Sequence, residues 1–337
     1  DEKNALYREN AGETHGAAQT WHSKLPVAWH NSTWTADRAI DWLKRKRDQP
    51  FMTWISFPDP HHPFDCPEPW SRLHHPDEVD IPRHRERDLD NRPWWHRAVL
   101  DTAPTGTKKN AEIRKAYSRI SPQRDEQLRE IIANTYGQIA LIDHQVGRIL
   151  ITLDELRLRD NTVVIYSSDH GDWLGDHGLV LKGPMHYEGL HRVGMIVRGP
   201  SIAAGQTISA PTSTIDVGPT LFDYAGCEAM QTQHGQSLRP LLETDQGRRE
   251  YAYSEWELHP NRAGVALSLR TVRTQTAKLT VDQISGDGEL YDLANDPDEM
   301  ANRFHDPDYK ALKDQLLGYI ARRPNDIGPV NEPVGMA

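Results

Sequence analysis

A long helical pattern that leads straight into a short apolar run constrains the fold more than any other feature. Apolar side chains recur with a 3.6-residue period through residues 121–160, which predicts one long helix. β-Branched and aromatic residues follow in the run 161–168, and a second such run lies at 192–199, so both are predicted strands. Buried strands joined through helices indicate a mainly parallel sheet covered by helices. The chain is therefore expected to be an α/β protein.

Two further elements are predicted upstream of the long helix. An apolar face predicts a helix near 33–47, with Ser32 and Thr33 as candidate N-caps. The apolar run 50–57 has strand length and composition. Prolines then recur through 58–70, which forbids both a helix and a central strand and predicts an irregular loop at a strand end.

The composition and residue pattern of the sequence change twice more along the chain. Residues 71–121 are charged and interrupted by prolines, which indicates a lid-like excursion with little regular structure. After residue 250, short alternating segments separated by turns predict a small antiparallel sheet, and a final helix follows near 308–321. We therefore expect an α/β domain over residues 1–250 and an antiparallel sheet plus helix over 251–337.

Composition excludes several classes of protein. The chain has 337 residues and a net charge of −10, which argues against a nucleic-acid partner because phosphate backbones require clustered Lys and Arg. No apolar run approaches membrane-spanning length, so no membrane partner is expected. The two cysteines, Cys66 and Cys227, supply no disulfide framework. The N-terminal sequence carries no targeting signal, which leaves cytoplasmic and periplasmic locations both open, as is the oligomeric state.

Asp169 and His170 directly follow the predicted strand 161–168. Ligands bind at the carboxyl ends of strands in open α/β sheets, and a carboxylate with an imidazole can hold a divalent metal there. Gly171 is expected to let the backbone turn sharply behind them. A second pair, Asp176 and His177, is better explained as structural support for the loop.

Lys182 and the proline loop supply further candidates. Lys182 lies between an apolar run and a Gly-Pro turn and is either aimed at the ligand of the metal or an ordinary solvated lysine. His61 and His62 lie between two prolines, which restrict the backbone and reduce the entropy cost of fixing an imidazole. One of them could donate to an anionic substrate or protonate a leaving oxygen. Asp59 either orients a histidine or caps the turn.

Four motifs in chain order resemble those of the type I sulfatase family in the alkaline phosphatase superfamily. They are DPHHPF at 59–64, SSDHGDWLGDHGLVLKG at 167–183, STIDVGPTLFDYAG with HGQSLRPLL within 213–242, and GELYDLANDPDEMANRF at 288–304. The resemblance covers essentially the whole chain. It implies an α/β fold with an alkaline phosphatase-like sheet sandwiched by helices and a small C-terminal antiparallel sheet.

The same resemblance implies roles for individual residues. Asp169 and His170 match half of the family's metal site, and Lys182 matches the lysine that binds the sulfate oxygens. His61 matches the histidine that faces the sulfate and the bridging oxygen, whereas His62 falls on a variable position. Ca²⁺ is the expected family ion, with Mn²⁺ as an alternative because a nitrogen ligand suits it better.

The family nucleophile is a formylglycine made within a C/S-x-P-x-R signature. The residues after Cys66 and Cys227 do not match this signature, so both cysteines are expected to be packing or surface residues. We therefore expect the chain to correspond to the C-terminal two-thirds of a sulfatase and to lack the N-terminal segment that carries the nucleophile. This chain by itself is expected to be inactive.

The predicted function is hydrolysis of a sulfate monoester, either a small molecule or a carbohydrate. One alternative is a phosphonate monoester or phosphodiester hydrolase of the same superfamily, and another is a non-catalytic, truncated sulfatase-like binding protein. His191 is a possible pocket residue for which a structural role is preferred. The residues that could line a pocket for the leaving group are Trp173, Trp94, Trp95, Glu255, Trp256 and His259, and ordinary packing is an equal alternative for most of them.

Overall fold

The computed structural model describes residues 2–7, 9–45, 49–84, 88–101, 122–228, 233–258 and 265–324. The chain forms two compact units. Unit 1 comprises residues 1–86, 121–162 and 174–181, and unit 2 comprises residues 87–120, 163–173 and 182–337. Two predictions fall wholly or partly outside the described residues, namely much of the 71–121 excursion and His259. The helix predicted near 33–47 is present but spans Asn31–Leu43, because Lys44 already caps its C-terminus. The predicted domain boundary near residue 250 stays a prediction.

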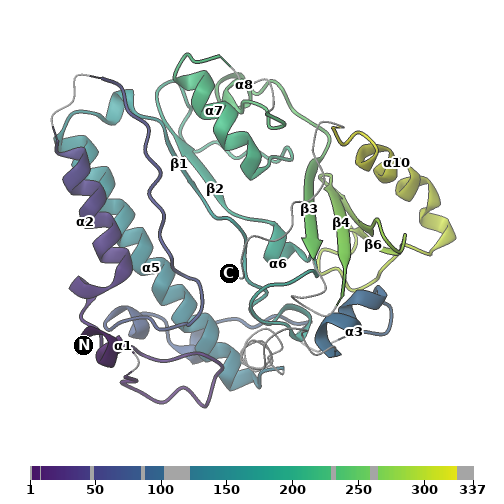
Figure 1. Ribbon diagram of the computed structural model, residues 1–337, viewed down its shortest axis with the longest axis horizontal. Coiled ribbons are helices and arrows are strands. Elements are labelled where there is room, and N and C mark those ends of the chain that lie inside the picture. The colour runs from purple at the N-terminus through teal and green to yellow at the C-terminus, as the bar shows by residue number, and fades with distance from the viewer. Residues whose placement is uncertain are drawn as a thin grey trace. The chain divides into compact units, whose positions relative to one another are not determined.

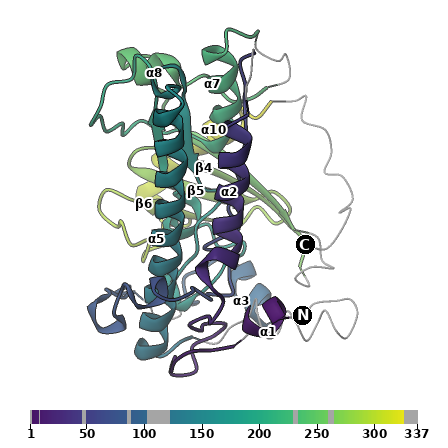
Figure 2. The same ribbon diagram turned by 90° about the vertical axis from the view of Figure 1, so that its left-hand side faces the viewer.

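Unit 1 is built around two packed helices. Its α-helices are α1 (Glu2–Tyr7), α2 (Asn31–Leu43) and α5 (Asp125–Glu155). Its 3₁₀ turns are Val27–Trp29, Trp70–Arg72, Pro76–Glu78, Arg159–Asn161 and Asp176–Gly178. Helices α2 and α5 lie side by side (Figures 1 and 2), and Gln145 of α5 donates to Thr33 of α2 at 3.3 Å. The long helix predicted from the 3.6-residue period is confirmed.

The N-cap of α2 differs from the prediction. His30 is the cap residue, because its Nδ1 accepts a hydrogen bond from the backbone N–H of Ser32 at 3.3 Å. Ser32 and Thr33, predicted as caps, are already inside the first turn and are buried. A histidine ring nitrogen performs here the task that a Ser, Thr, Asp or Asn oxygen usually performs.

The prediction of a strand at 50–57 is wrong within the described part of the chain. Residues 51–58 are extended but pair with no strand among the described residues. An extended segment becomes a strand only when a neighbour accepts and donates backbone hydrogen bonds. The side chains of Met52 and Trp54 are 72% and 89% exposed, so composition alone overestimated the burial of this run.

Unit 2 carries two sheets. Its strands are β1 (Val164–Ser167), β2 (Met195–Arg198), β3 (Ala252–Leu258), β4 (Leu267–Arg273), β5 (Ala277–Asp282) and β6 (Gly288–Asp292). Its α-helices are α3 (Trp94–Asp101), α6 (Glu188–His191), α7 (Val217–Tyr224), α8 (Arg239–Thr244) and α10 (Lys310–Ile320), with 3₁₀ turns at Thr214–Asp216 and Pro307–Tyr309.

Strands β1 and β2 form an antiparallel pair in which Val164 lies opposite Arg198 and Ser167 opposite Met195. The expected parallel arrangement is therefore wrong for this pair. A parallel pair needs a crossover connection, usually a helix, whereas the four-residue α6 is the only α-helix in the described segment between these strands. Met195 and Val197 pack against leucines of the α8 region, while Ile196 between them is 67% exposed, so β2 alternates as a half-covered strand does.

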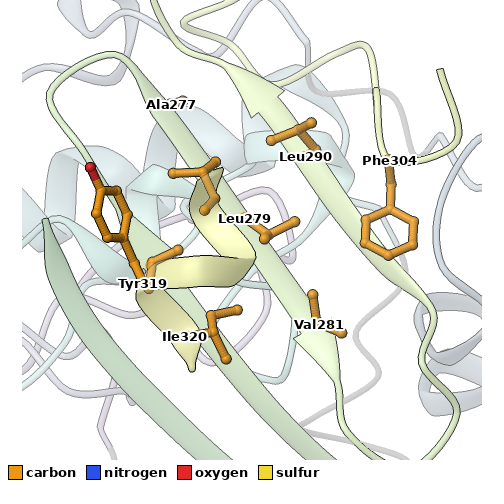
Figure 3. Close-up of a cluster of buried hydrophobic side chains, with 9 residues drawn as sticks. Ala277, Leu279, Val281, Leu290, Phe304, Tyr319 and Ile320 are labelled. Atoms are coloured by element: carbon orange, nitrogen blue, oxygen red, sulfur yellow. The ribbon is translucent and has the colours of Figure 1, made fainter. Parts of the chain in front are cut away.

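The C-terminal sheet has the strand order β3-β4-β5-β6, with every neighbouring pair antiparallel (Figure 1). Helix α10 covers one face, where Tyr319 and Ile320 pack with Leu279, Val281 and Leu290 (Figure 3). The predicted antiparallel sheet and final helix are thus confirmed. Alternation along β5 directs Leu279 and Val281 toward this apolar cluster and leaves the residues between them for the opposite face.

The opposite face of β5 buries charge. Lys278 is 1% exposed and forms ion pairs with Glu299 and, at 3.5 Å, with Glu188. Glu188 also accepts from Arg273 at 3.0 Å. Every residue of β5 is therefore buried, with hydrocarbon on one side and compensated charges on the other.

His186 belongs to the same polar layer and gives unit 2 a specific dependence on pH. Its side chain is buried, its Nδ1 lies 2.7 Å from Thr271 Oγ1, and its ring stacks on His191 with 4.0 Å between centroids. Burial, aided by the charges of His191, Lys278 and His96, holds the pKa of His186 well below its ordinary value of 6.5. The unfolded chain therefore binds a proton below pH 6.5 that the folded chain does not bind.

Because of this difference, acidification below pH 6.5 is expected to lower the free energy of unfolding by about 1.4 kcal/mol for each pH unit through His186 alone. Replacing His186 with asparagine should remove this contribution, so the wild type should lose more stability than the variant between pH 6.5 and pH 5. Urea unfolding across this range measures both slopes. The exposed His305→Asn variant is the matched control, and equal slopes for wild type and His186→Asn would contradict the prediction.

Candidate active-site residues

The loop that follows β1 carries Asp169 and His170. Asp169 Oδ1 accepts from the backbone N–H of His170 at 2.9 Å, and Ser168 Oγ donates to the carbonyl of His170 at 2.7 Å. The second oxygen, Asp169 Oδ2, lies 3.4 Å from His170 Nε2. The carboxylate is exposed and the imidazole is about one-third exposed, so both can meet a ligand from solvent.

The ring of His170 has a defined tautomer. Its Nδ1 lies 2.8 Å from the carbonyl oxygen of Gly171 and can only donate to it. In the neutral ring the lone pair is therefore on Nε2, and Lys182 Nζ lies 2.9 Å from that nitrogen. The structure thus brings together three of the four predicted site residues: Asp169, His170 and Lys182.

The donor set suits half of a metal site. Two ligand atoms that bind one cation at 2.0–2.5 Å are roughly 3 Å apart, close to the separation of Asp169 Oδ2 and His170 Nε2. A ligating histidine usually donates its other ring N–H to a carbonyl or carboxylate, as His170 does to Gly171. Within the described ranges, no group of three or more His, Cys, Asp and Glu side chains could hold a metal ion. A cation bound by this pair therefore needs further ligands.

Gly171 is required for a different reason from the one predicted. Its backbone N–H donates to the carbonyl of Leu190 at 2.8 Å, and a Cβ at this position would lie 2.0 Å from the carbonyl oxygen of Gly189. Close approach of two backbone segments, rather than a special turn, excludes a side chain. The contact fastens the loop of Asp169 and His170 to α6.

The Gly171→Ala variant is expected to lower the free energy of unfolding by about 1–3 kcal/mol, because the obstructing atom is backbone and cannot rotate away. Gly194→Ala is the matched control, since a Cβ there meets nothing within 4 Å. Urea unfolding of both variants measures the difference. Equal stability of the two variants would show that the loop moves freely.

Two tryptophans hold the backbone that follows Lys182. Trp173 Nε1 donates to the carbonyl of Met185 at 3.1 Å, and Trp95 Nε1 donates to the carbonyl of Pro184 at 3.2 Å. Trp173 also lies against Gly183, where a Cβ would be 2.8 Å from its ring. Both indoles are buried, 4% and 0% exposed, which agrees with packing rather than pocket lining among the two roles left open for them.

The other pocket candidates differ from the two buried indoles in their exposure and contacts. Trp94 is 42% exposed and donates to Ser285, and Glu255 forms ion pairs with Arg323 and Arg270. Trp256 is partly buried against the cluster around Trp95. His191 stacks on His186, which agrees with the structural role preferred for it.

His61 belongs to unit 1, in the proline loop. Its Nδ1 donates to the carbonyl of His62 at 2.7 Å, and the two imidazoles stack with 4.0 Å between centroids. The side chain is exposed, and Nε2 is the ring nitrogen left to exchange a proton or to donate. Its predicted role, like those of Asp169, His170 and Lys182, stays a prediction.

The second Asp-His pair supports the loop of unit 1. Asp176 Oδ1 lies 3.2 Å from His84 Nε2, and the ring of His84 lies against that of His177 with 4.9 Å between centroids. His177 is 3% exposed and adopts a φ of 52°. These contacts agree with the structural role predicted for the pair.

The roles of three supporting residues were not predicted: His30 as a cap, and Trp95 and Trp173 as backbone anchors. Only His30 had a local signal, since it directly precedes the helical pattern of α2. Trp95 lies 89 positions from the carbonyl it binds, a separation for which a single sequence has no signal.

Among the described helices, none combines the length and the apolar character needed to cross a membrane.

Comparison with known proteins identifies the family. Residues 11–227 match the family described as Sulfatase, and residues 175–325 match the family described as N-sulphoglucosamine sulphohydrolase, C-terminal. The chain therefore belongs to the sulfatase family, which confirms the resemblance and the α/β fold with a small C-terminal antiparallel sheet.

Individual relatives agree with this assignment. The uncharacterized sulfatase YidJ of Escherichia coli K12 is 30% identical over 302 residues, which are 86% of this chain and 55% of that protein. The chain thus spans a little over half the length of this relative. The phosphonate monoester hydrolase of Agrobacterium radiobacter is 27% identical, with a TM-score of 0.73 over 94% of this chain and 64% of that one. A protein solved with its substrate D-glucosamine-2-N,6-O-disulfate shares the fold at 22% identity, with a TM-score of 0.71 over 87% of this chain and 69% of that one.

Proposed function

We propose that the full-length protein hydrolyses sulfate monoesters. The observation that carries the proposal is the convergence of Lys182 Nζ and Asp169 Oδ2 on His170 Nε2, at 2.9 and 3.4 Å. A cation-binding pair beside a lysine ammonium suits a tetrahedral oxyanion, whose charge needs compensation from more than one side. Membership of the sulfatase family selects the sulfate ester among such oxyanions.

Asp169 and His170 would hold one divalent cation, with Ca²⁺ as the expected ion and Mn²⁺ as the alternative. When bound, the cation would neutralise sulfate charge and lower the pKa of the nucleophile, a formylglycine supplied outside residues 1–337. His170 would present the Nε2 lone pair to the cation because its Nδ1–H is engaged by Gly171. Lys182 Nζ, which lies 2.9 Å from that nitrogen in this structure, would then turn to the sulfate oxygens. The exposed Asp169 carboxylate would supply an oxygen from the same loop.

Lys182 and His61 would act on the substrate itself. The ammonium of Lys182 would stabilise the charge that the non-bridging sulfate oxygens carry. With both ring nitrogens protonated, His61 would donate from Nε2 to the bridging oxygen and pass that proton to the leaving alkoxide, which takes the electron pair of the broken S–O bond. The hydrogen bond from His61 Nδ1 to the carbonyl of His62 directs this chemistry to Nε2.

A small-molecule or carbohydrate sulfate ester is the proposed substrate. The solved relative with a bound disulfated glucosamine and the match of residues 175–325 to a sulphoglucosamine sulphohydrolase domain support a sulfated sugar. Trp94, 42% exposed on α3, is one of the described pocket candidates that remain accessible.

A phosphonate monoester or phosphodiester hydrolase is the second candidate. The likeness to the Agrobacterium radiobacter enzyme, which extends over 94% of this chain, favours it. Sulfur and phosphorus oxyanions need similar clamps, so the residues of this loop suit both substrates.

Turnover of 4-nitrophenyl sulfate and of a phenylphosphonate ester by the full-length protein tests these alternatives. The proposal expects metal-dependent sulfate hydrolysis with the larger kcat/KM for the sulfate ester. A larger kcat/KM for the phosphonate ester would establish the second candidate. Absence of both activities in the metal-loaded protein would leave the non-catalytic binding protein as the correct interpretation.

A further inference from the structure

The loop that carries His61 is fastened to the N-terminus of α2 through Asp59. Ser32 Oγ donates to Asp59 Oδ2, and His30 Nδ1 lies 3.6 Å from the same oxygen. Ser32 is 0% exposed, the side chain of His30 is 3% exposed and that of Asp59 is 10% exposed. This contact is therefore buried polar structure, where loss of a partner is costly.

The attachment point of Asp59 is rigid because the two residues beside its carboxylate, His30 and Ser32, belong to the N-terminal end of α2. His30 is the N-cap, and its Nδ1 accepts from the backbone N–H of Ser32 at 3.3 Å. Ser32 lies in the first turn of a 13-residue helix, so its position follows that of α2. The positive end of the helix macrodipole also favours a carboxylate at this place.

A second anchor lies on the far side of the histidines. The backbone N–H of Phe64 donates to the carbonyl of Gln19 at 2.8 Å, and that of Trp21 donates to the carbonyl of Phe64 at 3.1 Å. The Phe64 side chain is 1% exposed. His61 is thus an exposed side chain on a short span between two buried attachment points, Asp59 and Phe64.

We propose that Asp59, through Ser32 and with His30 beside it, is a positioning residue for His61. The inference rests on the proposed function, in which His61 acts on the bridging oxygen. The Asp59 carboxylate does not reach the reacting atoms in this scheme; it restricts where the backbone of His61 can lie. A catalytic imidazole displaced by about 1 Å loses on the order of 10²-fold in rate, so this restriction has a measurable effect.

The experiment compares Asp59→Ala, Asp59→Asn, Ser32→Ala and the Ser32→Ala/Asp59→Ala double variant of the full-length protein. Asp59→Ala and Ser32→Ala are each expected to lower kcat for a sulfate ester by about 10- to 100-fold with KM changed less than about twofold. Asp59→Asn should recover much of the rate because an amide oxygen still accepts from Ser32. The double variant should be no slower than the slower single variant, since both changes remove the same contact.

A second measurement reports on His61 without activity. The ring signals of His61 in a ¹H–¹³C spectrum, assigned with His61→Asn, should shift and broaden in Asp59→Ala and Ser32→Ala but not in the control Asp77→Asn, whose side chain is 87% exposed. Unchanged His61 signals together with unchanged kcat would overturn the inference. If the wild type hydrolyses no sulfate ester, the proposed function fails, while the His61 signals still decide whether Asp59 positions the ring.

Discussion

Replacing Lys182 with alanine is expected to reduce kcat/KM for a sulfate ester by about 30- to 1,000-fold, or about 2–4 kcal/mol of transition-state stabilisation. The Lys182 ammonium lies 2.9 Å from His170 Nε2, beside the proposed metal ligands. The backbone just after Lys182 is held in place because the indoles of Trp95 and Trp173 donate to the carbonyls of Pro184 and Met185. The lost interaction is expected to be stronger in the transition state than with the bound ester, so the effect should fall on kcat more than on KM.

Two variants make the Lys182 result specific. Lys182→Arg retains the charge but changes its geometry, and it should recover only part of the rate. Lys310→Ala removes an exposed lysine of α10 and should leave turnover unchanged. An unchanged rate in Lys182→Ala, measured with the metal-loaded protein, would remove Lys182 from the site.

Replacing Lys278 with alanine is expected to lower the free energy of unfolding by about 3–5 kcal/mol. Lys278 is 1% exposed and pairs with Glu299, whose side chain is 3% exposed. Burial raises the pKa of Glu299 to about 7 even beside Lys278, so removal of the lysine costs stability either as an uncompensated buried charge or as uptake of a proton by the carboxyl. Urea unfolding of wild type and variant gives the difference directly.

A neutral replacement of both partners separates the lost charge compensation from lost packing. The Lys278→Met/Glu299→Gln double variant keeps similar volumes and removes both charges, so it should be clearly more stable than Lys278→Ala. If the double variant is as unstable as Lys278→Ala, packing rather than charge compensation holds this part of unit 2 together.

The elements that the sequence predicts correctly are those set by local pattern. The period of 3.6 residues over 121–160 appears as α5 because each turn of a helix presents its apolar face without help from distant residues. The alternation of apolar and polar residues after residue 250 corresponds to the sheet β3-β4-β5-β6, because successive side chains of a strand point to opposite faces. The family also follows from sequence alone, since its motifs have characteristic residues at characteristic spacings.

The elements that the sequence predicts incorrectly depend on partners far along the chain. An apolar run does not specify which neighbour it pairs with. The antiparallel arrangement of β1 and β2 therefore had no local signal, and neither had the lack of a strand partner for segment 51–58 among the described residues. The same limit applies to Trp95 and Trp173, for which the sequence left pocket lining and packing both open and which the fold buries, with their indoles hydrogen-bonded to the carbonyls of Pro184 and Met185.

The candidate site divides in the same way. The residue types at Asp169, His170, Lys182 and His61 are readable from sequence, because cation and oxyanion chemistry require particular side chains. Their arrangement is not readable: the tautomer of His170, the approach of Lys182 to its ring and the attachment of Asp59 to Ser32 all arise from contacts. The sequence by itself thus determined the family, the main helices and the chemical groups of the site. Only the tertiary structure decided how the groups within each unit face one another, because hydrogen bonds and close backbone approaches form between segments that the chain brings together by folding.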